Sequence, residues 1–234
     1  RRHSFPTRRS SDLAARAWSP EILAATGLGV AQMPRIVEGS STAAVLPPAM
    51  ATELGLPAGI PLAGGAGDAA AGAIGIGAID DGDGFVSLGT SAQYFVTTGS
   101  YRPYPERLIH AYCHGLPERW FQSAALLNGA SCLGWAARML GEPDIPALLA
   151  RVEAAWRGPS RILFLPYLAG ERTPHDDPNA RGVLFGLDAD SSGIDVAQAV
   201  IEGVAFSLAE AQDCLAAAGT DVAAPAAIGG GSRS

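Results

Sequence analysis

The sequence predicts an α/β fold, because segments of strand character alternate with segments whose apolar residues have helical spacing. Residues 84–97 form two apolar runs joined by a short turn, which predicts a β-hairpin. Residues 60–79 predict a short strand, a glycine turn and a helix of small residues. A long amphipathic helix is indicated by apolar residues at a spacing of four, namely Val196, Val200, Val204 and Leu208.

The other N-terminal and central elements follow in chain order. Two short helices are expected before residue 60, opening at Ser19-Pro20 and at Pro47-Pro48. A second pair of strands is expected at residues 108–115 and 119–127. Residues 128–131 are expected to cap the helix that comes next.

The C-terminal part begins with an expected strand at residues 161–167 and a polar loop from Gly170 to Gly182. Loops rich in Asp, Pro and Asn are usually turns held by internal hydrogen bonds. This loop is therefore expected to be structural, with Arg172 or Arg181 as an internal ion-pair partner. One more strand is expected at residues 223–228, after the long helix.

The composition is that of a packed globular protein, with 48% hydrophobic and 17% charged residues in a chain of 234. Residues 1–13 resemble a translated sequencing adapter and are interpreted as a non-native leader. Removing their four Arg and one Asp reduces 16 basic and 23 acidic residues to 12 and 22, a net charge of −10. This balance argues against a nucleic-acid partner. The chain has no Lys, so a phosphate must be held by backbone amides, hydroxyls, Arg or a metal ion.

Two features indicate a cytoplasmic protein without a membrane partner. Residues 54–79 are apolar, but two prolines, eight glycines and Asp68 interrupt them, so no membrane span is predicted. The three cysteines lie far apart in apolar stretches, which predicts reduced core thiols at Cys113, Cys132 and Cys214. No residue is assigned as a direct metal ligand.

The turn of the predicted hairpin, Gly89-Thr90-Ser91, has the features of an anion site. Its backbone N–H groups are expected to be unpaired, and with the two hydroxyls they form a concavity that suits a phosphate. Hairpin turns of small polar residues are also common for structural reasons alone. The surroundings of the turn therefore decide the interpretation.

Asp68 is the only ionisable residue between Glu53 and Asp80. Its place at a strand-to-helix turn is typical of a helix N-cap or of a solvated loop acid. The functional interpretation is a general base on the dry floor of a cleft, where Gly65 and Gly67 let a substrate approach the backbone. The structural and functional interpretations are compatible.

Two segments resemble the FGGY carbohydrate kinases. Gly182-Val-Leu-Phe-Gly-Leu187, followed after seven residues by Asp195-Val-Ala-Gln-Ala-Val-Ile-Glu202, is similar to the second signature of that family at every defined position. Residues 165–182 resemble a loop of the xylulokinase branch of the family. The resemblance covers residues 14–234.

The resemblance implies an actin-like ATPase (ribonuclease H-like) fold of two related α/β domains with a cleft between them. Residues 14–78 then correspond to the C-terminal part of the sugar-binding domain. Residues 79–234 correspond to a truncated nucleotide-binding domain. On this interpretation the fold is incomplete at both ends.

Site residues are implied position by position. Asp68 corresponds to the catalytic base, and Ala69 departs from the family, which commonly has an amide side chain there. The other correspondences are the second phosphate loop at Gly89, Thr90 and Ser91, a nucleotide loop at Gly229, Gly230, Gly231 and Ser232, and a further nucleotide contact at Gly129, Ala130 and Ser131.

The implied reaction is transfer of the γ-phosphoryl group of ATP, with Mg²⁺, to a ketopentose, which the resemblance identifies as D-xylulose. The partner is then a small sugar. A homodimer of the full-length protein stays open.

Two alternatives remain from the sequence. Residues 65–70 fit the loose dinucleotide-binding fingerprint Gly-x-Gly-x-x-Gly/Ala of an NAD-binding domain. That assignment would place the Asp68 carboxylate beside a pyrophosphate, a repulsion on the order of 4 kcal/mol at about 4 Å and an effective dielectric of about 20. The other alternative is that this chain alone is an inactive fragment or a nucleotide-binding remnant.

Overall fold

The computed structural model describes residues 11–222 and 224–233, and the chain divides into two compact units. Within the described residues, the first unit comprises residues 11–79, 97–101 and 111–121. The second comprises residues 80–96, 102–110 and 122–233, without residue 223. Residues 1–10 of the expected leader lie outside the described residues.

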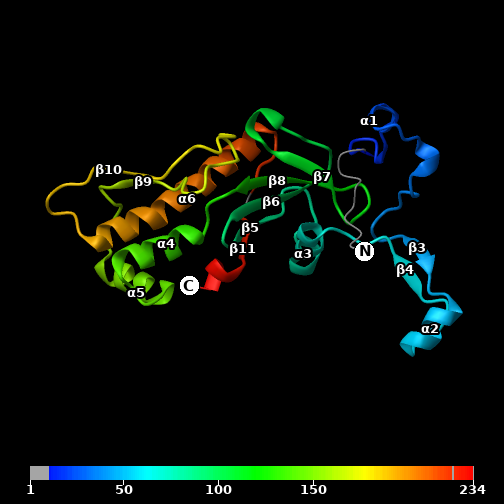
Figure 1. Cartoon of the computed structure of the whole chain (residues 1–234), viewed down its shortest axis with the longest axis horizontal. Helices are drawn as coiled ribbons and strands as arrows, with labels where there is room; N and C mark the ends of the chain where they lie inside the picture. The colour runs from blue at the N-terminus through cyan, green and yellow to red at the C-terminus, as the bar shows by residue number, and fades with distance from the viewer. Residues whose placement is uncertain (1–10, 223, 234) are drawn as a thin grey trace. The chain divides into compact units, whose positions relative to one another are not determined.

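The first unit consists of short elements, shown in blue to teal in Figure 1. Ser19 caps the first helix by accepting the Ile22 N–H at 3.3 Å, and the left-handed Gly55 ends the second helix, so both expected helices are confirmed. The elements are β1 (Ser11–Asp12), β2 (Ala17–Trp18), α1 (Pro20–Ala25), η2 (Val30–Gln32), β3 (Thr42–Val45), α2 (Pro48–Leu54), β4 (Pro61–Ala63) and α3 (Asp68–Ile76).

The sheet of the second unit has five strands in the order β11-β5-β6-β8-β7. The expected hairpin is confirmed, because β5 and β6 pair antiparallel from Gly84↔Val96 to Leu88↔Ala92. The last strand pairs parallel with β5, with Ile228 opposite Ser87. The bounds are β5 (Gly84–Leu88), β6 (Ala92–Thr98), η3 (Pro105–Arg107), β7 (His110–Cys113), β8 (Trp120–Leu126) and β11 (Ala226–Ile228), of which β6, β7 and β8 have one end in the first unit.

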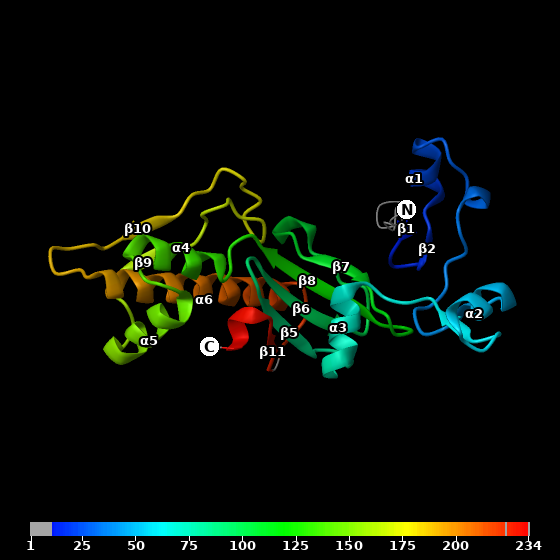
Figure 2. The same ribbon diagram turned by 60° about the horizontal axis from the view of Figure 1, so that its bottom comes forward.

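A helical layer and a small second sheet complete the second unit. Figures 1 and 2 both show α6 running alongside α4. The strand at 183–185 was not expected from the sequence, since it is only three residues long and stands between glycines. The bounds are α4 (Ser131–Leu140), α5 (Ile145–Ala155), β9 (Leu163–Leu165), β10 (Val183–Phe185), α6 (Gly193–Ala217) and η4 (Gly230–Arg233).

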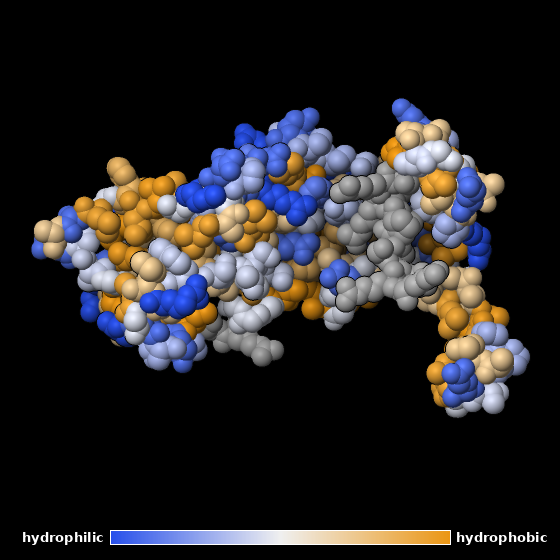
Figure 3. Space-filling view, viewed as in Figure 1, coloured by the Kyte–Doolittle hydropathy of each residue, from blue (hydrophilic) through white to orange (hydrophobic). Residues whose placement is uncertain are grey.

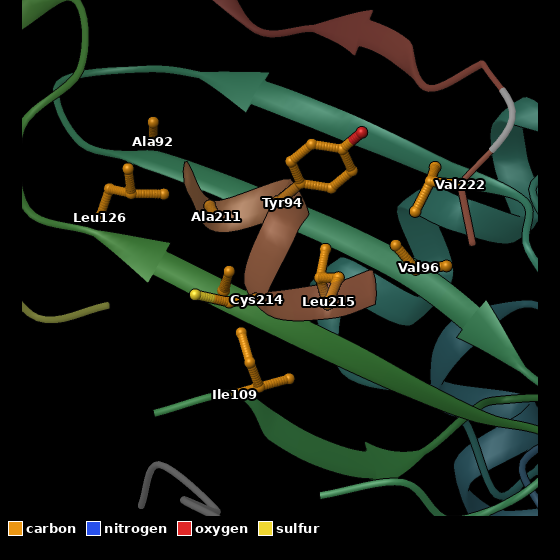
Figure 4. Close-up of a cluster of buried hydrophobic side chains, with 10 residues drawn as sticks. Ala92, Tyr94, Val96, Ile109, Leu126, Ala211, Cys214, Leu215 and Val222 are labelled. Atoms are coloured by element: carbon orange, nitrogen blue, oxygen red, sulfur yellow. The ribbon is translucent and has the colours of Figure 1, made fainter. Parts of the chain in front are cut away.

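The long helix α6 connects two apolar clusters of the second unit. Its C-terminal half packs on the five-stranded sheet, where Ala211, Cys214 and Leu215 meet residues such as Tyr94 and Ile109 (Figure 4). Its N-terminal half packs on α4, α5 and β9 through residues that include Val200. The predicted apolar stripe is confirmed, because all four of its members lie in these clusters.

Close packing of α6 on β9 depends on Gly203, where a Cβ atom would overlap the Phe164 carbonyl oxygen. The β9–β10 strand pair has a second face, which is apolar and exposed and which Figure 3 shows in orange. This face carries Leu163, Leu165, Val183 and Phe185.

Among the described helices, none combines the length and apolar character that crossing a bilayer requires.

Candidate functional site

The turn between β5 and β6, residues 89–91, keeps donors free for a ligand. The Gly89 N–H donates to the Ser91 carbonyl oxygen at 3.0 Å, which closes the turn. Thr90 and Ser91 are exposed, and within the described residues their N–H groups and hydroxyls make no hydrogen bond. Four donors therefore remain at one turn, as an anion site requires.

The segment that leads into α4, residues 127–131, supports this turn from behind. The Gly129 and Ser131 N–H groups both donate to the Thr90 carbonyl oxygen, at 3.1 and 3.3 Å. The Ala130 N–H donates to the Gly89 carbonyl oxygen at 2.9 Å. These amides are thus occupied by the turn, so a nucleotide could contact residues 129–131 only through other atoms. Their contact with a nucleotide stays a prediction.

The loop after β11, residues 229–232, lies at the end of β5 and hence next to the turn. Gly229 has a left-handed φ of 92°, and a Cβ there would lie 2.8 Å from the Leu88 carbonyl oxygen. A Cβ at Gly231 would lie 2.9 Å from the Leu88 Cβ. The Ser232 hydroxyl donates to the Gly229 carbonyl oxygen at 2.8 Å. The structure thus brings together, in one unit, three segments that the sequence analysis selected separately.

The cap expected from residues 128–131 is not formed by a side chain. The residue before the helix is Ala130, and it makes no side-chain cap bond. The Asn128 side chain, which is buried, instead bonds to the polar loop at residues 169–171. The expectation of an Asn or Ser cap was wrong because tertiary partners compete for these short polar side chains.

The polar loop is held by internal hydrogen bonds, as expected: the backbones of Glu171 and Asp177 exchange two, at 2.8 and 2.9 Å. The expectation that Arg172 or Arg181 forms an ion pair within the loop is wrong. Arg172 lies 3.0 Å from His110 Nε2, and Arg181 donates to backbone carbonyl oxygens. A guanidinium has only donors, so His110 Nε2 accepts this bond. Burial, together with the Arg172 charge, lowers the pKa of His110.

Sequence reasoning missed Glu171 as a member of the site. Its side chain is 2% exposed and bonds to the segment that supports the turn. The available signal was an acid directly after the mostly apolar stretch Leu165 to Gly170, but only the tertiary contacts give it a role.

Asp68 is the first residue of α3, in the first unit. It is exposed, and within the described residues its carboxylate makes no hydrogen bond or ion pair. The dry setting expected for this acid is therefore not formed by its own unit, because its neighbours are glycines and alanines without side chains that could cover it. Its role as a base stays a prediction.

The glycine turn before Asp68 is anchored to the segment before β3. The Gly64 N–H donates to the Ser41 carbonyl oxygen at 3.0 Å, and the Gly65 N–H donates to the Gly39 carbonyl oxygen at 2.9 Å. Gly65 has φ +81° with nothing within 4 Å of a Cβ position, so the backbone is open there. Since β4 pairs antiparallel with β3 in a two-stranded sheet, the parallel β-α-β unit of a dinucleotide-binding domain is not formed at this turn.

The three cysteines are free thiols, as expected, although Cys113 is only half-buried. Cys132 is 0% exposed and lies at the start of α4. Burial, with the Glu171 charge nearby, raises the pKa of Cys132 to about 11.

We expect this thiol to make the free energy of unfolding fall at alkaline pH. An unfolded Cys titrates near pH 8.5, so the stabilisation is complete below about pH 8.5 and is lost as the pH rises to about 11. Urea unfolding of the wild type and of Cys132→Ala from pH 7.5 to 10.5 measures this. The wild type should lose more stability than Cys132→Ala over that range; parallel curves would contradict the expectation.

Comparison with known proteins identifies two family domains in the chain. The sequence model of the FGGY family of carbohydrate kinases, C-terminal domain, matches residues 84–234. That of the N-terminal domain matches residues 7–75, so it begins inside the stretch interpreted as a leader.

Curated relatives include xylulose kinases. That of Escherichia coli (strain K12) is 43% identical over 223 residues, which cover 95% of this chain and 46% of the relative. That of Bacillus subtilis (strain 168) is 33% identical and covers 92% of this chain and 44% of the relative. The chain thus spans just under half the length of these relatives.

Solved structures of sugar kinases are also similar to this chain. A xyloylose kinase from Brucella ovis has a TM-score of 0.92 and 44% identity, and covers 96% of this chain and 46% of that one. A gluconate kinase from Lactobacillus acidophilus has a TM-score of 0.85 and 28% identity, and covers 95% and 46%. The family resemblance and the actin-like α/β fold are thereby confirmed.

Proposed function

Because the chain belongs to the FGGY family of carbohydrate kinases, we propose that the full-length protein transfers the γ-phosphoryl group of ATP to the primary hydroxyl of a ketopentose, converting D-xylulose to D-xylulose 5-phosphate. The observation that carries the proposal is the convergence of three segments, residues 89–91, 129–131 and 229–232, at one end of the second unit's sheet. The names of the xylulose kinase relatives support the choice of sugar.

The β5–β6 turn fits the phosphates of ATP. The free N–H groups and hydroxyls of Thr90 and Ser91 would donate to phosphate oxygens, in place of the lysine that this chain lacks. Such transfer depends chiefly on alignment and on neutralising the charge of the moving phosphoryl group.

Mg²⁺ is the cofactor that phosphoryl transfer from ATP ordinarily uses. Within residues 11–222 and 224–233 no group of three or more His, Cys, Asp or Glu side chains is placed to hold a metal ion. The described residues therefore do not form a protein-built metal site, and we assign no step to one.

Asp68 would act on the sugar. Its carboxylate would accept the proton of the attacking hydroxyl as the oxygen bonds to phosphorus, and the open backbone at Gly65 would let the sugar approach. In this proposal residues 14–78 belong to the sugar-binding domain and residues 79–234 to the nucleotide-binding domain. Residues 97–101 and 111–121 then belong to the nucleotide-binding domain, although they cluster with the first unit.

A coupled assay of ADP release by the full-length protein on a panel of ketoses tests the proposal. We expect D-xylulose to give the highest kcat/KM, followed by other ketopentoses, with no turnover when NAD replaces ATP. The 234-residue chain alone, with and without an added N-terminal half, is the control that distinguishes an inert fragment from one that can be complemented. Absence of phosphorylation of every ketose would refute the proposal.

A further inference from the structure

Glu171 is a buried carboxylate whose bonds go to neutral donors. Its Oε1 accepts the Leu127 N–H at 2.7 Å and the Arg172 N–H at 2.8 Å, and its Oε2 accepts Asn128 Nδ2 at 3.2 Å. In the part of the chain that the structure describes, it forms no ion pair. A buried carboxylate without hydrogen bonds is costly, so the local conformation that supplies these three donors is favoured.

The donors to Glu171 from outside its own loop belong to residues 127–131, the segment between β8 and α4. Asn128 is 1% exposed, and its Nδ2 also donates to the Gly170 carbonyl oxygen at 2.7 Å. Its Oδ1 accepts the Ala169 N–H at 3.2 Å. Glu171 and Asn128 therefore attach this segment to the polar loop. Each oxygen and nitrogen atom of their two side chains has at least one hydrogen bond.

The same segment holds the β5–β6 turn. Three consecutive N–H groups, at residues 129–131, donate to the carbonyl oxygens of Gly89 and Thr90. This uses the carbonyl side of the turn and leaves the N–H groups of Thr90 and Ser91 for a ligand. A shift of the segment would therefore change the turn itself.

We propose that Glu171 is a positioning residue of the phosphate site, which fixes residues 127–131 so that they clamp the β5–β6 turn in its anion-binding conformation. The inference rests on the proposed function for the identity of the anion, the phosphates of ATP. The carboxylate is required because both of its oxygens face N–H donors. A glutamine would present an NH₂ group to the Asn128 amide or to the backbone N–H groups.

The test compares Glu171→Gln with a matched control, Thr173→Val, in the full-length protein. Thr173 lies in the same loop and is 1% exposed. Its hydroxyl accepts the Ala125 N–H and donates to the Leu108 carbonyl oxygen, both at 3.2 Å, and neither of these hydrogen bonds is to residues 127–131. Thr173→Val therefore removes buried hydrogen bonds of the same loop but not the proposed link.

Two measurements are needed. The first is the hydrogen-exchange rate of the amides at 129–131, and the second is KM for ATP, compared with KM for the ketose in the same variant. Glu171→Gln should speed exchange and raise KM for ATP, each by about tenfold, as expected for loss of a charge-assisted hydrogen bond. KM for the ketose should not change, and Thr173→Val should leave both readouts near wild type. Unchanged exchange in Glu171→Gln, or equal changes in Thr173→Val, would overturn the inference.

The exchange readout separates this inference from the proposed function. If exchange changes as expected but the wild type neither binds ATP nor turns over, the kinase proposal fails and the positioning role stands. Should Glu171→Gln not fold, Asn128→Ser removes the hydrogen bonds of the Asn128 amide to Glu171, Gly170 and Ala169 and leaves the bond between Glu171 and the Leu127 N–H. Faster exchange at 129–131 is again the supporting result and unchanged exchange the opposing one.

Discussion

Replacing Asp68 by Asn in the full-length protein should lower kcat by roughly 100- to 10,000-fold, the usual contribution of a general base. The substitution keeps the size of the side chain and removes its ability to take a proton. Because the phosphate turn lies in the other unit and does not include Asp68, the Kd for ATP should stay within about twofold. Steady-state kinetics and calorimetric titration with ATP measure the two quantities.

A matched control for this experiment is Glu53→Gln, on α2 of the same unit. Glu53 is an exposed acid, the one preceding Asp68 in the sequence, and has no part in the proposed site. The Glu53→Gln substitution should leave kcat and KM unchanged. Near-normal turnover of Asp68→Asn would remove Asp68 from the role of base, and an equal loss in Glu53→Gln would point to a non-specific effect of charge.

Gly129→Ala should weaken ATP binding by about tenfold or more and lower stability by about 1–3 kcal/mol, since overpacking against backbone leaves no easy relaxation. The added Cβ would lie 2.7–2.9 Å from three backbone atoms of Gly89 and Ser91. The turn must move to admit it, which disturbs the donors proposed to hold phosphate. Thermal unfolding, with a fall of about 2–12 °C, and ATP titration measure the two effects.

Gly134→Ala is the matched control, five residues further along and inside α4. Its Cβ would meet the Arg138 Nη1 at 3.6 Å and the Ile145 Cδ1 at 3.9 Å, both ordinary contacts. Alanine favours the helix over glycine by up to about 1 kcal/mol, so stability should be unchanged or higher and ATP binding unaffected. If Gly129→Ala binds ATP like Gly134→Ala, close contact between the turn and residues 129–131 does not matter for the nucleotide.

Much of the fold could be predicted because its signals are local. The hairpin at 84–97, the helix starts at Ser19 and Pro47, and the stripe of α6 depend on the spacing of apolar residues and on residues that start or end elements nearby. The ion pairs proposed for Arg172 and Arg181 and the cap at residues 128–131 were wrong. Asn128 and Arg172 have partners 42 and 62 residues away in the sequence, which no local pattern specifies. Arg181 instead donates to the nearby carbonyl oxygens of Pro178 and Ala180.

By itself, the sequence determined the α/β class, the family, the lysine-free turn at Gly89-Thr90-Ser91 and the isolated acid at Asp68, since each is written in a contiguous stretch of residues. Only the tertiary structure decided that residues 129–131 use their amides to hold this turn and that Glu171 fixes them in place. The physical reason is that hydrogen bonds between segments about 40 residues apart depend on which strands become neighbours in the sheet, and the packing of the whole unit sets that order.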